Sequence, residues 1–235
     1  MLNSDAATES QLLAAGVATA LPLVLTYTWA TKPNYSLTAA GTIINISDVG
    51  GEGGSLWKAT SAGWVPLNGV VKLASKWGTV ASPVATISGS TGALFVPTGG
   101  SGSLIIPASM LIPEHSVLRA RAVMHRRGIN GTATARIYLG TAGTSSDDTA
   151  YSLGIAATDT LEIRPDVEIG VVASASMTGT NWMAPGSTGS SPTAVTAMTT
   201  NINTAAAMTL SVGMDNANAL DSFDLIGYSV LLESL

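Results

Sequence analysis

Cysteine is absent from the 235-residue chain. This absence excludes disulfide bridges, zinc sites built on thiolates and cysteine nucleophiles, and it is compatible with synthesis in a reducing cytosol. His115 and His125 are the only histidines, and their surroundings match no metal-ligand motif. The sequence therefore predicts no metal site, and no other feature of it indicates a cofactor.

Charge is also scarce. Charged residues make up 11% of the chain and aromatic residues 5%, whereas apolar residues reach 46%. A soluble domain usually carries roughly 25% charged residues, and a monomer needs charge on its surface to remain soluble. We therefore expect other copies of the chain or other proteins to cover much of the folded surface. The alternative is a monomer with a surface of serine and threonine.

The net charge of −5 gives no electrostatic basis for nucleic-acid binding. The basic residues are densest in Arg119–Arg127, where alternation predicts a strand. Arg119 and Arg121 would share one face, and Ala120 and Ala122 the other. This pattern favours a strand with one solvated or intersubunit face, and the alternative is a face that binds an acidic glycan or phosphate.

Residues 1–25 form an apolar stretch that differs from the rest of the chain. Ser4 and Asp5 suit the start of a helix, and Pro22 should end it. A signal peptide would need basic residues before its apolar run, but no Lys or Arg precedes Lys32. The apolar run is also too short for a membrane span, and Pro22 interrupts it. We expect a helical or extended anchoring arm that docks on another protein without inserting into a membrane.

Residues 26–75 read as a small β module in which glycine-rich turns join short strands. The segment LWKATSAGW places Trp57 and Trp64 on either side of a turn, which is a hairpin signal. Residues 76–93 are rich in Gly, Ser and Thr and are predicted to be a linker. Four tryptophans are the predicted core anchors of this part of the chain: Trp29, Trp57, Trp64 and Trp77.

Residues 94–235 contain about eight alternating segments with turn signals between them, a pattern typical of a β-sandwich or jelly roll. Asn130-Gly131 should form a hairpin that joins the strands Val117–Arg127 and Thr132–Gly140. The predicted fold class is therefore mainly β. It comprises a helical or extended arm, a small hairpin module and a C-terminal antiparallel sandwich resembling a jelly roll.

No catalytic motif is present. A depolymerase would need two carboxylates about 5–10 Å apart, and a long repetitive spike would show a repeat of about 20–50 residues, which is missing. We therefore expect no enzymatic activity, and a polysaccharide depolymerase is the least favoured reading. The carboxylates that could be considered are Asp147 and Asp148, then Glu162, Asp166 and Glu168, and finally Asp215, Asp221 and Asp224.

The segment from residue 26 to residue 75 resembles a module of virion proteins of tailed bacteriophages. The resemblance rests on YTWATKP (Tyr27–Pro33), ISDVG (Ile46–Gly50), Leu56-Trp57 and GWVP (Gly63–Pro66). Residues 94–235 resemble the β-sandwich that follows this module in such proteins. The resemblance implies a homotrimer on the particle surface, as a fibre, spike or capsid decoration, and it carries over no catalytic residue.

The expected function is that of a non-enzymatic virion structural protein, made in the host cytoplasm and displayed on the virion surface. It would be a homotrimeric capsid decoration or head fibre that docks on capsid or tail proteins through residues 1–40. The alternative is a short tail fibre that binds host surface glycans through the distal loops Thr141–Thr149 and Thr178–Thr193. The candidate glycan contacts are Asp147, Asp148, Asn181 and Trp182.

Overall fold

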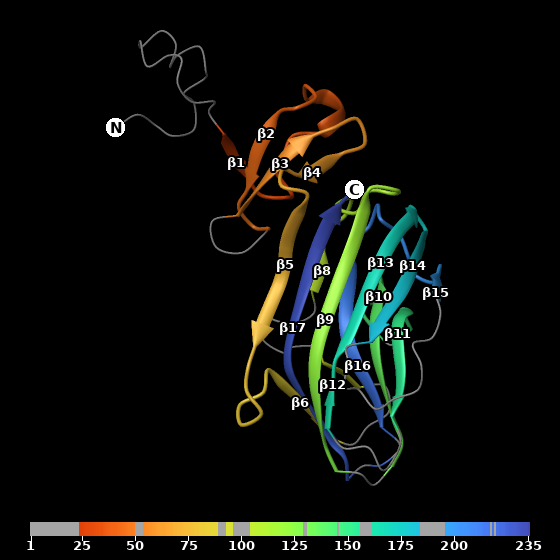
Figure 1. The fold of residues 1–235 in the computed structure, drawn as a ribbon. Helices are drawn as coiled ribbons and strands as arrows, with labels where there is room; N and C mark the ends of the chain where they lie inside the picture. Colours follow the sequence, from red (N-terminus) through yellow and green to blue (C-terminus); the bar gives the residue numbers. More distant parts are fainter. Residues whose placement is uncertain are drawn as a thin grey trace.

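The chain folds as β-strands throughout the part that the structure describes. The computed structural model (Figure 1) describes residues 24–49, 54–88, 93–95, 104–128, 131–144, 146–155, 161–183, 196–216, 218 and 220–235. Within these ranges the one helical element is a single 3-10 turn, η1 (Tyr35–Leu37), and there is no α-helix. The prediction of a mainly β fold is confirmed. Apart from Val24 and Leu25, the predicted arm lies outside the described residues.

The small module is a four-stranded sheet in the order β1-β2-β3-β4. Strand β1 runs parallel to β2, and the remaining pairs are antiparallel. Thr60 stabilises the β3–β4 hairpin, because its hydroxyl donates to the carbonyl of Gly63 at 2.8 Å. The bounds are β1 Leu25–Tyr27, β2 Ile43–Ile46, β3 Ser55–Ala59 and β4 Trp64–Pro66.

Three tryptophans form the centre of the module. Trp29, Trp57 and Trp64 are 5%, 0% and 3% exposed. Trp29 meets Trp57 edge to face, with ring centroids 5.0 Å apart, a favoured aromatic arrangement. The indole Nε1 of Trp64 donates to the carbonyl of Pro33 at 2.9 Å, and that of Trp29 donates to the carbonyl of Ala108 at 3.0 Å. The Trp29 bond ties the module to the domain that follows.

That domain is a sandwich of two antiparallel sheets (Figure 1). An eight-stranded sheet has the order β15-β14-β13-β9-β17-β5, with β12 beside β9 and β6 beside β17. A five-stranded sheet has the order β11-β10-β16-β7, with β8 beside β16. The bounds are β5 Val70–Trp77, β6 Ala85–Ser88, β7 Ala93–Phe95, β8 Leu104–Ile106, β9 Ser116–Arg127, β10 Ala133–Gly140, β11 Asp148–Ile155, β12 Leu161–Ile163, β13 Pro165–Ala173, β14 Ser176–Met183, β15 Thr196–Met198, β16 Met208–Asn216 and β17 Ser222–Ser234.

Alternation along the strands builds the core between the two sheets. In β9, Ala120, Ala122 and Met124 are buried while Arg119 and Arg121 face outward, as the sequence predicted. Burying one large apolar side chain stabilises a fold by about 1.5–3 kcal/mol, so the following buried side chains dominate the sandwich: Leu118, Met124, Ile137, Leu139, Val167, Ile169, Leu210, Phe223, Leu225 and Leu232.

The predicted hairpin at Asn130-Gly131 is wrong. Strand β9 belongs to the eight-stranded sheet and β10 to the five-stranded sheet, so the chain crosses between the layers here. Asp221 stabilises this crossing, because its carboxylate accepts hydrogen bonds from the guanidinium of Arg126 at 2.6 Å and from the backbone N–H of Gly131 at 3.1 Å.

The predicted linker 76–93 is also wrong in part. Strand β5 continues to Trp77, and β6 lies within the segment. Both strands pair with β17, so their backbone hydrogen bonds are made within the eight-stranded sheet. Side-chain bonding also favours a strand here, because the hydroxyl of Thr86 donates to Asp224 at 2.6 Å. Small polar residues therefore form sheet structure in this segment rather than a flexible connection.

Candidate interaction surfaces

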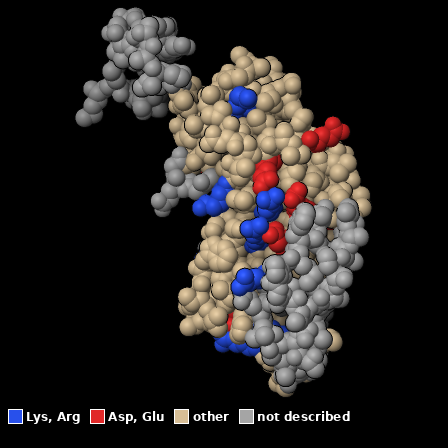
Figure 2. Space-filling model, viewed as in Figure 1, with Lys and Arg blue, Asp and Glu red and all other residues tan. Residues whose placement is uncertain are grey.

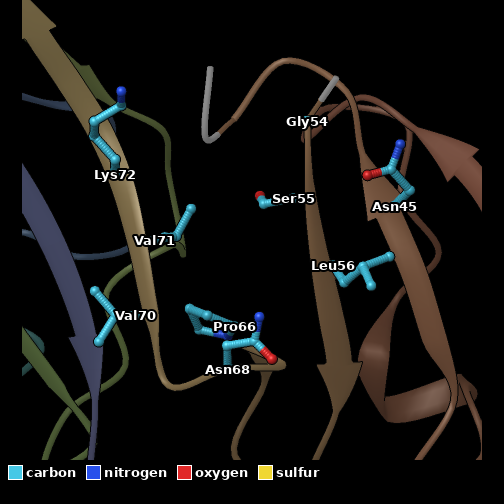
Figure 3. Close-up of a pocket in the computed structure, with 9 residues that line it drawn as sticks. All are labelled: Asn45, Gly54, Ser55, Leu56, Pro66, Asn68, Val70, Val71 and Lys72. Atoms are coloured by element: carbon cyan, nitrogen blue, oxygen red, sulfur yellow. The ribbon is translucent and has the colours of Figure 1, made fainter. Parts of the chain in front are cut away.

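A groove of about 480 Å³ separates the small module from the start of β5 (Figure 3). Val70, Val71 and Lys72 form one wall, and residues of β2 and β3 form the other. Its walls combine aliphatic side chains with a few polar ones, which suits contact with a polypeptide. The lining consists of Asn45, Gly54, Ser55, Leu56, Pro66, Asn68, Val70, Val71 and Lys72.

Three apolar side chains are exposed on the side of this groove, next to the polar Asn45 and Lys58. Ile43 is 36% exposed, Leu56 41% and Val70 48%. Alternation in β2 and β3 explains the exposure, since Ile44 and Trp57 point inward and their neighbours outward. We call Ile43, Leu56 and Val70 the module face.

An ion-pair ladder crosses the outer face of the eight-stranded sheet. Arg121 pairs with Asp166 at 2.7 Å, and Arg119 pairs with Glu168 at 3.2 Å and Glu233 at 3.3 Å. The hydrogen bond that Arg119 donates to Glu168 is the largest cause of the raised pKa of Arg119. Figure 2 shows these opposite charges interspersed on one side of the molecule. The carboxylates of Asp166 and Glu168 are thus engaged by cations of the same sheet.

A second charged cluster lies at the end of the sandwich far from the module. Asp221 and Asp224 are fully buried, and Asp221 pairs with the buried Arg126. Asp224 accepts from Arg127 at 2.5 Å and lies 4.0 Å from the ring of His125. Each buried carboxylate has a cationic partner, so removal of that partner would leave an uncompensated charge inside the protein. Among the described residues, no group of His, Asp and Glu is arranged to hold a metal ion.

The predicted glycan contacts are not gathered into one site. Asp147 is 5% exposed, and its carboxylate accepts from the backbone N–H groups of Ala142 at 3.0 Å and Gly143 at 2.7 Å. Asp148 accepts from the N–H of Thr200 at 2.5 Å. Both carboxylates therefore organise loops rather than face a ligand, which corrects the expectation for Asp147.

The two predicted loops also lie differently from the expectation. The segment 141–147 joins β10 to β11 and contacts Asn201, at the module end of the sandwich rather than the distal end. The segment from Thr178 to Met183 is part of β14 instead of a loop. Asn181 and Trp182 belong to that strand, opposite Val167 and Asp166, and their side chains lie outside the described residues.

Trp77 is the predicted core anchor that the structure places outside the core. It is 59% exposed, whereas the other three predicted anchors are buried. Trp77 is exposed because it ends an edge strand and faces outward opposite Gly227 in β17. Its indole Nε1 donates to the hydroxyl of Ser75 at 3.2 Å. The sequence signal available for this exposure was the surrounding run SKWG, in which no large apolar neighbour accompanies the tryptophan.

Comparisons with known proteins give no family assignment. No protein-family profile matches the chain, and no curated protein does. Solved structures with a similar arrangement include arcelin-5, a lectin-like defense protein from Phaseolus vulgaris (7% identity, 71% of this chain, 100% of that chain, TM-score 0.33). Others are lectin II from Ulex europaeus (11%, 70% and 93%, 0.33) and the CBM2 module of an evolved Dit from Lactobacillus casei BL23 phage J-1 (8%, 71% and 90%, 0.32). Scores this low carry no argument about function.

No helix in the described part of the chain has the length and hydropathy to span a membrane. Lys and Arg together number 10 against 15 Asp and Glu, and the cations of the outer sheet are mostly paired with carboxylates. Among the described residues, the module face with its groove and the region around Trp77 are two surfaces that expose large apolar side chains.

Proposed function

We propose that this chain is a non-enzymatic structural protein of the bacteriophage virion surface, a homotrimeric capsid decoration or head fibre. The observation that carries the proposal is the module itself. The segment that resembles a phage virion module folds into one unit around Trp29, Trp57 and Trp64. This unit ends in an apolar face that a monomer would leave in water.

The exposed side chains of the module face support the homotrimer. Leu56 and Val70 flank the groove and are both more than a third exposed, so a second copy could bury them together. Light scattering of the purified chain should give the mass of a trimer. Leu56→Lys and Val70→Lys should shift this mass toward the monomer, while Val172→Lys, at a 52% exposed position of β13, should leave it unchanged. A wild-type chain that remains a monomer at micromolar concentration would contradict the trimer.

Attachment to the particle is assigned to the N-terminal part of the chain. Residues 1–23 lead directly into β1, the first strand of the module, so an arm there would emerge beside the module and away from the distal end of the sandwich. Deleting residues 1–23 should leave a folded trimer that no longer enters particles. Normal incorporation of the shortened chain would show that another surface makes the attachment. Labelling the protein on particles by electron microscopy would distinguish head from tail.

The engaged state of the carboxylates supports a non-enzymatic role. Asp166, Glu168 and Asp224 each bond an arginine, and Asp147 bonds backbone N–H groups. A retaining or inverting glycosidase needs one carboxyl group to protonate the leaving oxygen and another free to attack or activate water. Incubating the protein with host surface polysaccharide should therefore release no reducing ends.

A short tail fibre that binds host glycans is the second candidate function. The observation that favours it is the indole of Trp77, which is 59% exposed on the outer face of the eight-stranded sheet and lies one row from Ser75 and Ser229. An adsorption assay with phage that carry Trp77→Ala would test this role, because a decoration protein would tolerate the change.

A further inference from the structure

We propose that the outer face of the eight-stranded sheet around Trp77 is a binding site for a pyranoside oligosaccharide. The indole would stack on one sugar ring, and polar side chains of the neighbouring strands would bond the hydroxyls of the next. The site differs from the loops first considered for glycan contact. It goes beyond the virion role, since a sugar could bind here in a monomer as well as in a trimer.

The first observation is that Trp77 is both exposed and held in place. Its exposed fraction is 59%, yet its ring packs against the backbone of Gly227, its register partner in β17. A methyl group on Gly227 would lie 2.2 Å from Cε3 and 2.6 Å from Cδ2 of the indole. Contact this close places the ring over the glycine, and the hydrogen bond from Nε1 to Ser75 fixes its orientation. One face of the indole therefore packs on the backbone of the sheet, while much of the ring remains exposed to solvent.

The second observation is the chemistry of the adjacent row. Sheet register aligns Ser75, Ser229, Arg121 and Asp166 across β5, β17, β9 and β13. Trp77, Gly227 and Val123 occupy the row two residues along, so the two rows lie about 7 Å apart. This distance lets a second sugar ring lie over the row of polar side chains while the first one lies on the indole.

Arg121 and Asp166 suit the role of sugar ligands. The side chain of Arg121 is 59% exposed, and its Nε donates a hydrogen bond to Asp166 at 2.7 Å. This bond holds the guanidinium in one orientation, and the guanidinium carries further N–H donors. Asp166 is an acceptor that is 21% exposed. A planar donor and a planar acceptor held together can bond vicinal hydroxyl groups, because the guanidinium donates a hydrogen bond to one hydroxyl oxygen while the carboxylate accepts one from the neighbouring O–H.

A second copy of the chain is the other occupant that an exposed tryptophan could have. Cores of protein–protein interfaces are depleted in charged residues, whereas the charged pair of Arg121 and Asp166 lies one row from Trp77, with two serines in that row and Val123 in the row of Trp77 itself. The apolar residues Ile43, Leu56 and Val70 lie instead at the module end of β5 or within the module. The polar setting therefore favours a hydroxyl-rich ligand at Trp77.

The test is titration of the purified full chain with a panel of tetrasaccharides: cellotetraose, chitotetraose, maltotetraose and a β-linked galactotetraose. We expect at least one to cause a saturable change in tryptophan fluorescence. Trp77→Ala should weaken that binding by about tenfold or more, equivalent to about 1.4 kcal/mol, and Trp77→Phe should weaken it less. Arg121→Ala should weaken it while leaving the fold intact. Leu37→Ala is the control, because Leu37 is 87% exposed in the small module, outside the eight-stranded sheet, and this variant should bind as the wild type does, as read by calorimetry.

Three outcomes would overturn the proposal. They are the absence of saturable binding to every member of the panel, undiminished binding by Trp77→Ala, and an equal loss of binding in Trp77→Ala and in Leu37→Ala. A change of oligomeric mass in Trp77→Ala without any sugar binding would identify the residue as an interface anchor. Failure of the sugar site leaves the virion role untouched, because mass and particle incorporation are measured separately.

Discussion

The indole of Trp77 occupies the space that a side chain on Gly227 would fill. The two residues are direct partners across β5 and β17, and a β-carbon on Gly227 would come within 2.2 Å of the ring. In the pairing of β17 with β9, the register also shifts between Leu225 and Gly227. An aromatic side chain packed over a strand glycine offsets the weakness that glycine brings to a sheet.

Gly227→Ala should therefore be destabilising. The new methyl group must displace the ring of Trp77, and overpacking of this kind typically costs about 1–3 kcal/mol. In a background of Trp77→Ala the same change should cost much less, since nothing remains over the glycine. Chemical denaturation of the four proteins of this double-mutant cycle measures the coupling. Equal costs in both backgrounds would show that the two residues are energetically independent.

Trp64→Ala should lower the stability of the module far more than Trp77→Ala. Trp64 is 3% exposed and its Nε1 bonds the carbonyl of Pro33, so truncation leaves a cavity and an unpaired carbonyl. The cost of a buried tryptophan is about 3–5 kcal/mol. Trp77 is 59% exposed and is the matched control. Thermal melting monitored by near-ultraviolet circular dichroism would compare the two; similar melting temperatures would contradict the core assignment.

Asp221→Asn should destabilise the distal end of the sandwich. The substitution removes the charge that faces the buried Arg126, and breaking a buried pair costs about 3–5 kcal/mol. Asp166→Asn is the control, because the exposed pair with Arg121 is expected to contribute about 0–1 kcal/mol. Urea unfolding gives both values. A loss at Asp166 as large as that at Asp221 would argue against burial as the cause.

Stability should fall in alkaline solution through Tyr151. Burial raises the pKa of this phenol to about 12, above the ordinary value of about 10. Between these values the unfolded chain releases a proton that the folded chain retains, so the contribution of Tyr151 is fully present below about pH 10 and is lost as pH rises toward about 12. Melting temperatures across this range should decline less steeply for Tyr151→Phe. An identical decline would assign the effect to other groups.

Most of the fold could be predicted from the alternation of apolar and polar residues along the strands. The faces of β9 could be assigned because Ala120 and Ala122 alternate with Arg119 and Arg121, and the pleat turns such a pattern directly into burial. The burial of Trp57 could likewise be expected from its apolar neighbours. These are local properties, which depend on a few consecutive residues.

Which strands pair with each other could not be predicted, because pairing depends on contacts between residues far apart in the sequence. Asn130-Gly131 has the composition of a hairpin, yet Asp221, some ninety residues later, pairs with Arg126 and bonds Gly131. No local signal predicts that. The same limit applies to Trp77, whose exposure follows from its position opposite Gly227 at a sheet edge. Asp147 is a different case, because its backbone partners lie within its own loop and its burial follows from the folded shape of that loop.

The order in which the eight-stranded sheet can form follows from the place of β17. This strand lies between β9 and β5 and also pairs with β6, although it is the last of them in the sequence. During synthesis at about 5–20 residues per second, β5 and β9 emerge from the ribosome well before the strand that joins them. Their edges must remain unpaired in the nascent chain for several seconds, so this sandwich is expected to fold only after β17 has left the ribosome, and chaperones that shield strand edges should raise its yield.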